Sequence, residues 1–281
     1  MSMNSINISL PGQTFTNTVN FTTSTTWTVP YNVTQLDVRV WAAGGGGNVD
    51  TRYGGGGGFI GGYLSVAPNE TLTIDIGAGG QARNLTEDCN LPRGKIHAGQ
   101  GGGGSRIYRN IDGYFIAGAG GGAGEGAHGG AGGGIIASGG GVGGSSGNPV
   151  SGSWGGAPGC TSCHDEDPTA GTNAGFSGSI ASGGSAGLNN ACPDGEDPPN
   201  YQSSTLEQGS GGSGYAGGGG GGVGGGGGGA SSGFEGGFLV SNLTGSGYFA
   251  ANLNDPSYPG SNTGYGGAYG NGNAGYISIK Y

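Results

Sequence analysis

The sequence predicts an all-β fold in which sandwich-like β-strands are joined to a bundle of polyglycine-II helices, with almost no α-helix. Glycine supplies 78 of the 281 residues, far above its average usage of about 7%. Short segments rich in β-branched and aromatic residues separate the glycine runs, as expected of strands. No segment has the periodicity of an amphipathic helix. We expect one domain, residues 1–281, with protruding loops near 84–95, 148–208 and 252–262.

The glycine runs need a source of stability other than side-chain burial. An ordered glycine costs about 0.5–1 kcal/mol more backbone entropy than alanine, so 78 of them cost on the order of 40–80 kcal/mol. Backbone hydrogen bonds and close main-chain packing must compensate. Collagen is excluded because the sequence has no strict Gly-X-Y period. The runs therefore predict glycine helices with three residues per turn that hydrogen-bond to one another.

Alternating segments predict the strands. Between Gln35 and Trp41, the residues Leu36, Val38 and Val40 lie on one face of the predicted strand. The end of the chain, residues 276–281, alternates in the same way and is expected to pair back into a sheet, joining both ends of the chain. The other predicted strands are residues 25–29, 59–66, 71–76, and a hairpin of 106–108 with 114–117 around Asp112-Gly113.

Charge and hydropathy exclude some partners. The net charge is −9, and the eight Lys and Arg residues form no basic patch in the sequence, so no nucleic-acid partner is expected. No apolar run reaches 18 residues, so no membrane span is expected. The first residues lack the basic and apolar regions of a signal peptide. This combination favours a protein that reaches the exterior as part of a particle.

The order of strands and glycine runs resembles the glycine-rich domain family. That family includes the extracellular domain of anaplastic lymphoma kinase and leukocyte tyrosine kinase, the tail-fibre-tip adhesins of T-even-like bacteriophages, and glycine-rich proteins of large viruses. The likeness covers roughly residues 21–123, the later glycine runs and residues 276–281. It is carried by residues 27–30 (WTVP), 33–47 (VTQLDVRVWAAGGGG), 58–63 (GFIGGY), 72–77 (LTIDIG), 101–105 (GGGGS) and 115–122 (FIAGAGGG).

The resemblance implies strands beside a polyglycine-helix bundle. In the phage adhesins, loops at the bundle tip contact the host receptor, and in the kinases the domain binds a protein ligand. This chain has no kinase domain. We therefore expect a virion-surface or extracellular adhesin, a spike or fibre-tip protein that binds a host surface glycan or protein through its loops. Other virion or fibre proteins are expected partners, with a homo-oligomeric or particle-attached state. The alternative is a structural capsid, particle or extracellular-matrix component that packs against copies of itself.

All four cysteines lie in the loop-like segments. An even number of cysteines in an exposed protein favours two disulfides among Cys89, Cys160, Cys163 and Cys192. A zinc site that includes His164, and free thiols, are the alternatives. Residues 160–164 also match the haem-attachment pattern C-x-x-C-H, but the chain offers few bulky apolar residues to enclose a haem. No resident cofactor is expected.

Acidic and aromatic residues of the loops supply the candidate binding positions. The acidic groups around Asp165 and Asp194 offer oxygen ligands for calcium, although their spacing is not that of an EF-hand, and solvated loops explain them more simply. Binding residues concentrate on loops that a scaffold holds. The receptor-binding candidates are Trp154, His164, Asp165, Glu166, Asp194, Tyr201 and Tyr258.

Catalysis is not expected. Residues 77–82 and 118–123 match the dinucleotide fingerprint, yet no helix follows either to hold a pyrophosphate. Residues 183–187 resemble a nucleophile elbow, again without a following helix. No nucleophile, base and orienting group converge in the sequence, so the chain is predicted not to be an enzyme.

Overall fold

The computed structural model describes residues 14–48, 52–82, 99–109, 114–124, 127–134, 211–218 and 226–281. Within these ranges the protein is all-β, with two antiparallel sheets and no helix. One sheet has the strand order β1-β10-β3-β4-β9, and the other has the order β2-β5-β6-β7-β8. The strands are β1 (Thr18–Phe21), β2 (Thr25–Thr28), β3 (Gln35–Trp41), β4 (Phe59–Ser65), β5 (Thr71–Asp75), β6 (Ser105–Tyr108), β7 (Tyr114–Ala117), β8 (Gly233–Glu235), β9 (Gly237–Leu243) and β10 (Tyr276–Lys280).

The predicted strands are confirmed, with small differences at their ends. β3 has the predicted bounds, and Leu36, Val38 and Val40 are fully buried on its inner face. β6 and β7 pair as the expected hairpin. β10 lies between β1 and β3, so the end of the chain does pair back beside its beginning. The strands β1, β8 and β9 were not predicted from the sequence.

A hydrophobic core gathers residues from both sheets. Leu36 and Ile60 come from one sheet, and Ile74, Ile107 and Phe115 come from the other, all with essentially no exposed surface. β8 and β9 join the two sheets at one side, where Gly236 has a φ of 70°. This left-handed conformation suits glycine because it has no Cβ. Because most of its side chains come from strands, the core lies where the two sheets are, rather than among the glycine-rich segments.

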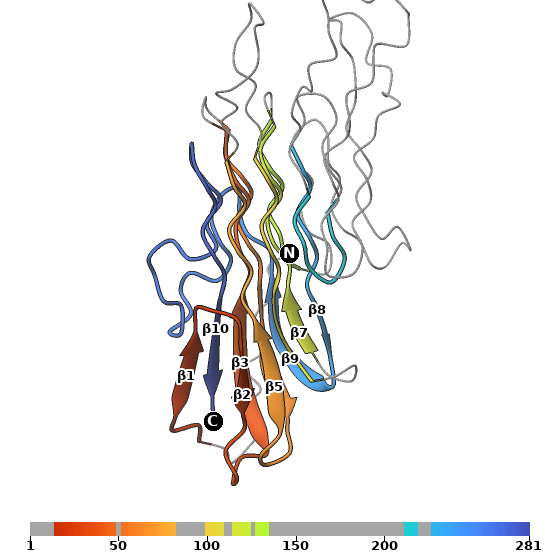
Figure 1. The fold of residues 1–281 in the computed structure, drawn as a ribbon, viewed down its shortest axis with the longest axis vertical. Helices are drawn as coiled ribbons and strands as arrows, with labels where there is room; N and C mark the ends of the chain where they lie inside the picture. Colours follow the sequence, from red (N-terminus) through yellow and green to blue (C-terminus); the bar gives the residue numbers. More distant parts are fainter. Residues whose placement is uncertain are drawn as a thin grey trace, which may run out of the picture.

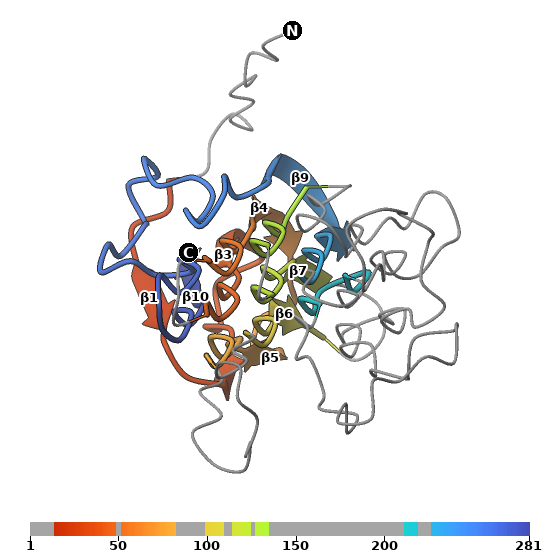
Figure 2. The ribbon, with the colours of Figure 1, turned by 90° about the horizontal axis from the view of Figure 1, so that it is seen from above.

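The glycine-rich segments continue from the ends of the strands along the long axis of the molecule (Figure 1). Seen from above, the described segments lie side by side (Figure 2). A row of backbone hydrogen bonds of 2.8–2.9 Å crosses them. In this row the N–H of Gly267 donates to Gly45, Gly45 to Gly55, Gly55 to Gly121, Gly121 to Gly130, and Gly130 to Gly227. The tracts 44–47, 54–58 and 118–124 are buried along their whole length. They are thus a hydrogen-bonded part of the interior rather than solvated loops.

Candidate functional site

Of the predicted site residues, only Tyr258 falls within the described part of the chain. The other predicted positions, and two of the three predicted loops (84–95 and 148–208), lie outside the described residues. The loop 252–262 lies against the outer face of the sheet that contains β1, β10 and β3. The positions outside the described residues are Trp154, His164, Asp165, Glu166, Asp194, Tyr201, Cys89, Cys160, Cys163 and Cys192.

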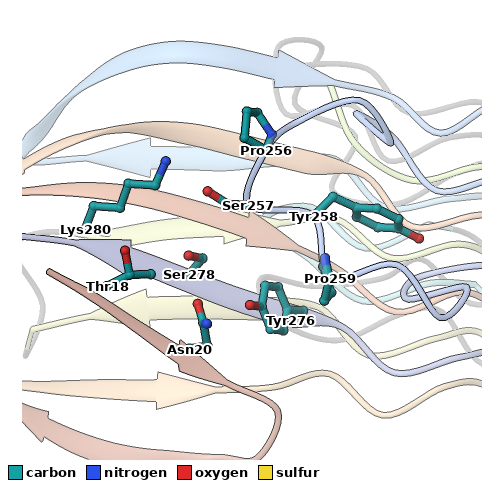
Figure 3. Close-up of a pocket in the computed structure, with 9 residues that line it drawn as sticks. All are labelled: Thr18, Asn20, Pro256, Ser257, Tyr258, Pro259, Tyr276, Ser278 and Lys280. Carbon is teal, nitrogen blue, oxygen red and sulfur yellow. The ribbon is translucent and has the colours of Figure 1, made fainter. Parts of the chain in front are cut away.

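The floor of a surface groove is formed by β1 and β10. On β10, Ile277 and Ile279 enter the core, so strand alternation places Tyr276, Ser278 and Lys280 on the outer face. The antiparallel register sets Thr18 opposite Lys280 and Asn20 opposite Ser278. A row of polar side chains from the two ends of the chain thereby comes together on one face (Figure 3).

Residues 256–259 form the wall of this groove (Figure 3). Two contacts hold the loop over β3, and a third, within the loop, braces the wall. The guanidinium Nε of Arg39 lies 3.5 Å from the Asp255 carboxylate. The same carboxylate accepts a 2.8 Å hydrogen bond from the backbone N–H of Ser257. The buried indole N–H of Trp41 donates to the Ala251 carbonyl at 3.0 Å. The loop thus covers β3 and leaves β1 and β10 partly open.

Tyr258 anchors the loop by its hydroxyl and packs by its ring. The hydroxyl donates a 3.0 Å hydrogen bond to the Thr263 carbonyl, and the ring centroid lies 5.8 Å from that of Trp41. Burial, and then the neighbouring Tyr265, raise the pKa of Tyr258 to about 12. In Figure 3 the hydroxyl points away from the polar floor. The structure therefore places this predicted residue at the groove, where its hydroxyl stabilises the wall.

Two serine hydroxyls in the groove have no hydrogen-bond partner among the described residues. They are Ser257 Oγ on the wall and Ser278 Oγ on the floor. Ser278 is only 1% exposed. A buried polar group without a partner costs about 1–3 kcal/mol. The groove encloses about 280 Å³, enough room for a small molecule whose polar groups satisfy these hydroxyls.

The charges next to the groove are balanced. The Arg39 guanidinium lies 2.7 Å from the Asp37 carboxylate, and the register sets Asp37 opposite Lys280. Burial raises the pKa of Asp37, whereas Arg39 and Lys280 act in the opposite direction. With Asp255, the network contains two carboxyl groups and two basic groups. It does not present a surface of one sign that would select a strongly charged ligand.

A second cluster of aromatic residues lies on the glycine-rich segments. The ring of Tyr53 stacks on His128 at 5.2 Å and on Tyr248 at 5.0 Å, and Tyr269 meets it edge-on at 5.8 Å. Phe249 and Tyr265 extend the cluster. Tyr269 is 54% exposed and Phe249 is 41% exposed. Because these rings pack chiefly on one another, they cover a surface that glycine leaves without side chains.

The His128 contact predicts a pH dependence of stability. Burial, and then Arg52, lower the pKa of His128 below its ordinary value of 6.5, and Nδ1 accepts a 2.9 Å hydrogen bond from the Tyr53 N–H. Between the folded pKa and 6.5 the unfolded chain binds more protons than the folded one, so the free energy of unfolding falls on acidification. Asn at this position can accept the same bond without titrating. Urea midpoints between about pH 5 and 8 should fall further at the acidic end for the natural chain than for His128→Asn. Parallel curves would contradict the assignment.

Sequence reasoning missed most of the groove. Thr18, Asn20, Ser278 and Lys280 were not among the predicted site residues, although the alternation in 276–280 does place Ser278 and Lys280 on the polar face. No local signal shows that β1 pairs with β10 in this register, because 255 or more residues separate the paired positions.

The described part holds neither a cluster of metal-ligating side chains nor a membrane-spanning helix. The described ranges contain no group of three or more His, Cys, Asp and Glu residues placed to hold a metal ion. They likewise include no helix with the length and hydropathy needed to cross a membrane.

Comparison with known proteins adds no family. No protein-family model matches the chain, and no curated protein matches it either.

Proposed function

We propose that this protein is a virion-surface or extracellular adhesin, a spike or fibre-tip protein that binds a host surface molecule through loops on a polyglycine scaffold. The observation that supports it most directly is the row of hydrogen bonds that crosses the glycine tracts from Gly267 to Gly227. The tracts satisfy their backbone groups mutually, so the scaffold requires no side chains of its own. The loops between tracts are then free to carry binding residues.

We infer further that the tracts are polyglycine-II helices and that the strands form a sandwich. Polyglycine-II helices have no internal hydrogen bonds and must donate outward. The tract bonds fit this requirement, since Gly55 both donates to Gly121 and accepts from Gly45 in other tracts. Seen nearly end-on in Figure 2, the described glycine-rich segments coil about their long axes, as polyglycine-II helices would. A core that draws on both sheets supports the sandwich.

Binding, rather than catalysis, is the function that this architecture supports. Polar groups at the described groove are hydroxyls, an amide and an ammonium, which suit hydrogen bonding to a ligand. The self-packing structural component stays the second candidate. It is supported by edge strands β8 and β9, where Phe234 is 39% and Phe238 is 48% exposed.

Replacing residues 148–208 by a short Gly/Ser linker separates the two candidates. We expect the fluorescently labelled full chain to bind a subset of a panel of bacterial and animal cells. The shortened chain should still unfold cooperatively, because the described strands and tracts lie outside the deletion. Its affinity for the cells should fall at least 10-fold, which corresponds to a loss of about 1.4 kcal/mol of binding free energy.

Tyr31→Ala is the matched control, since Tyr31 is 76% exposed in the turn between β2 and β3. It should bind like the natural chain. If the full chain binds no cell in the panel, or if the shortened chain binds normally but no longer assembles into oligomers, the adhesin proposal is wrong and the structural candidate gains.

A further inference from the structure

The structure assigns a neutral saccharide site to the groove between β1, β10 and residues 256–259. This inference rests on the proposed adhesin function and names the ligand chemistry of one contact. Ser278 is the central observation. Its side chain is buried at 1% exposure, lines the groove, and leaves its hydroxyl unpartnered among the described residues.

The polar groups of the groove match the hydroxyls of a sugar. A serine hydroxyl donates one hydrogen bond and accepts up to two, and an asparagine amide does both. Figure 3 shows the amide of Asn20 directed toward Ser278, the hydroxyl of Tyr276 directed toward the same region, and Ser257 above it on the wall. Vicinal sugar hydroxyls also donate and accept, so a sugar in the groove is chemically matched to these groups.

The groove also offers an apolar surface beside these groups. Tyr276 lies on the floor, and Pro256 and Pro259 flank the wall. A pyranose has an apolar C–H face and a polar rim of hydroxyls. Its C–H face can pack on the apolar faces of aromatic and proline rings. A volume of about 280 Å³ lies just below the range of about 300–1,000 Å³ for pockets that bind drug-sized ligands. It therefore fits one sugar ring.

Charge balance favours a neutral sugar over an acidic one. Lys280 is the basic side chain that lines the groove, and the register places it opposite Asp37 on β3. Arg39 is already engaged by Asp37 and Asp255. An anionic sugar would have to compete with these carboxylates for the two cations, whereas a neutral sugar needs only the hydroxyls and the amide.

The test uses the full chain and saturation-transfer NMR with glucose, galactose, mannose, N-acetylglucosamine, glucuronic acid and N-acetylneuraminic acid. We expect saturable binding of at least one of the four neutral sugars. Ser278→Ala should weaken that binding about 2- to 10-fold, the effect of one hydrogen bond. The variant should fold at least as stably as the natural chain, since it removes an unpartnered buried hydroxyl. Ser65→Ala, which alters an exposed serine on β4 outside the groove, is the matched control and should bind unchanged.

The outcomes separate this inference from the adhesin proposal. Absence of binding to every neutral sugar, binding confined to the two acidic sugars, or equal affinity in Ser278→Ala would each overturn the saccharide site. If Ser278→Ala still adheres to the same cells with unchanged affinity for sugars, the adhesin proposal stands and the groove assignment fails. Sugar binding that depends on Ser278 in a chain that adheres to no cell would leave the groove assignment standing and remove the adhesin.

Discussion

Gly55→Ala should prevent folding, or reduce the free energy of unfolding by more than about 4 kcal/mol, the range of exceptional single substitutions. Gly55 lies in a fully buried tract. Its N–H donates to Gly121 and its carbonyl accepts from Gly45. A Cβ at this position would overlap the carbonyl of Gly130, which is backbone and cannot rotate away. Neighbouring tracts would have to separate, which breaks hydrogen bonds on both sides.

Gly270→Ala is the matched control for this prediction. A Cβ at Gly270 would meet no atom within 4 Å, and its φ is not in the left-handed region. Alanine there should be neutral or stabilise by about 0.4–1 kcal/mol, because it restricts the unfolded chain. Guanidinium unfolding followed by far-ultraviolet circular dichroism compares the two variants. Equal midpoints for Gly55→Ala and Gly270→Ala would show that close packing of the tracts is not what stabilises them.

Trp41→Ala should lower the free energy of unfolding by about 3–5 kcal/mol, the usual cost of removing a buried tryptophan. Trp41 has no exposed surface. Its ring packs against Phe59 at 4.7 Å, Tyr258 at 5.8 Å and Tyr276 at 5.8 Å. The substitution also removes the hydrogen bond to Ala251, which holds the loop that forms the groove wall.

Trp41→Phe separates the two contributions. It retains an aromatic ring and loses the hydrogen bond, so it should cost less than Trp41→Ala, with about 0.5–1.5 kcal/mol arising from the lost bond. Both variants should weaken binding in the groove, since both release Ala251. Denaturant unfolding and sugar titration of the same samples check this order. A cost near zero for Trp41→Ala would mean that the loop and the sheet are stabilised independently.

The prediction of individual strands succeeded for segments with clear alternation or with β-branched and aromatic composition, and it failed for β1, β8 and β9. β3 carries Leu36, Val38 and Val40 at every second position, which is the pattern of a half-buried strand. β1 has four residues, with Phe21 as its one buried side chain. β9 is an edge strand whose residues are intermediate or exposed. β1 is short, and β9 shows little contrast in burial between its two faces, so neither segment was predicted as a strand.

The residues of the groove come from segments that lie far apart in the sequence. Tyr258, in a loop flanked by prolines, was identified from the sequence, and the structure places it beside the groove. Its partner Trp41 is more than two hundred residues away, and the floor joins Asn20 to Ser278 across most of the chain. Such long-range pairs depend on strand register, which short sequence patterns do not specify.

By itself, the sequence determined that the interior must be built largely from main chain, because 78 glycines leave few side chains to bury. Where alternation was strong, as in β3, it also determined which residues face the apolar core. Tertiary structure alone decided which tracts bond to one another and which polar side chains meet on the outer face. Those choices depend on the register between β1, β10 and β3, and register is a property of paired strands rather than of any one segment.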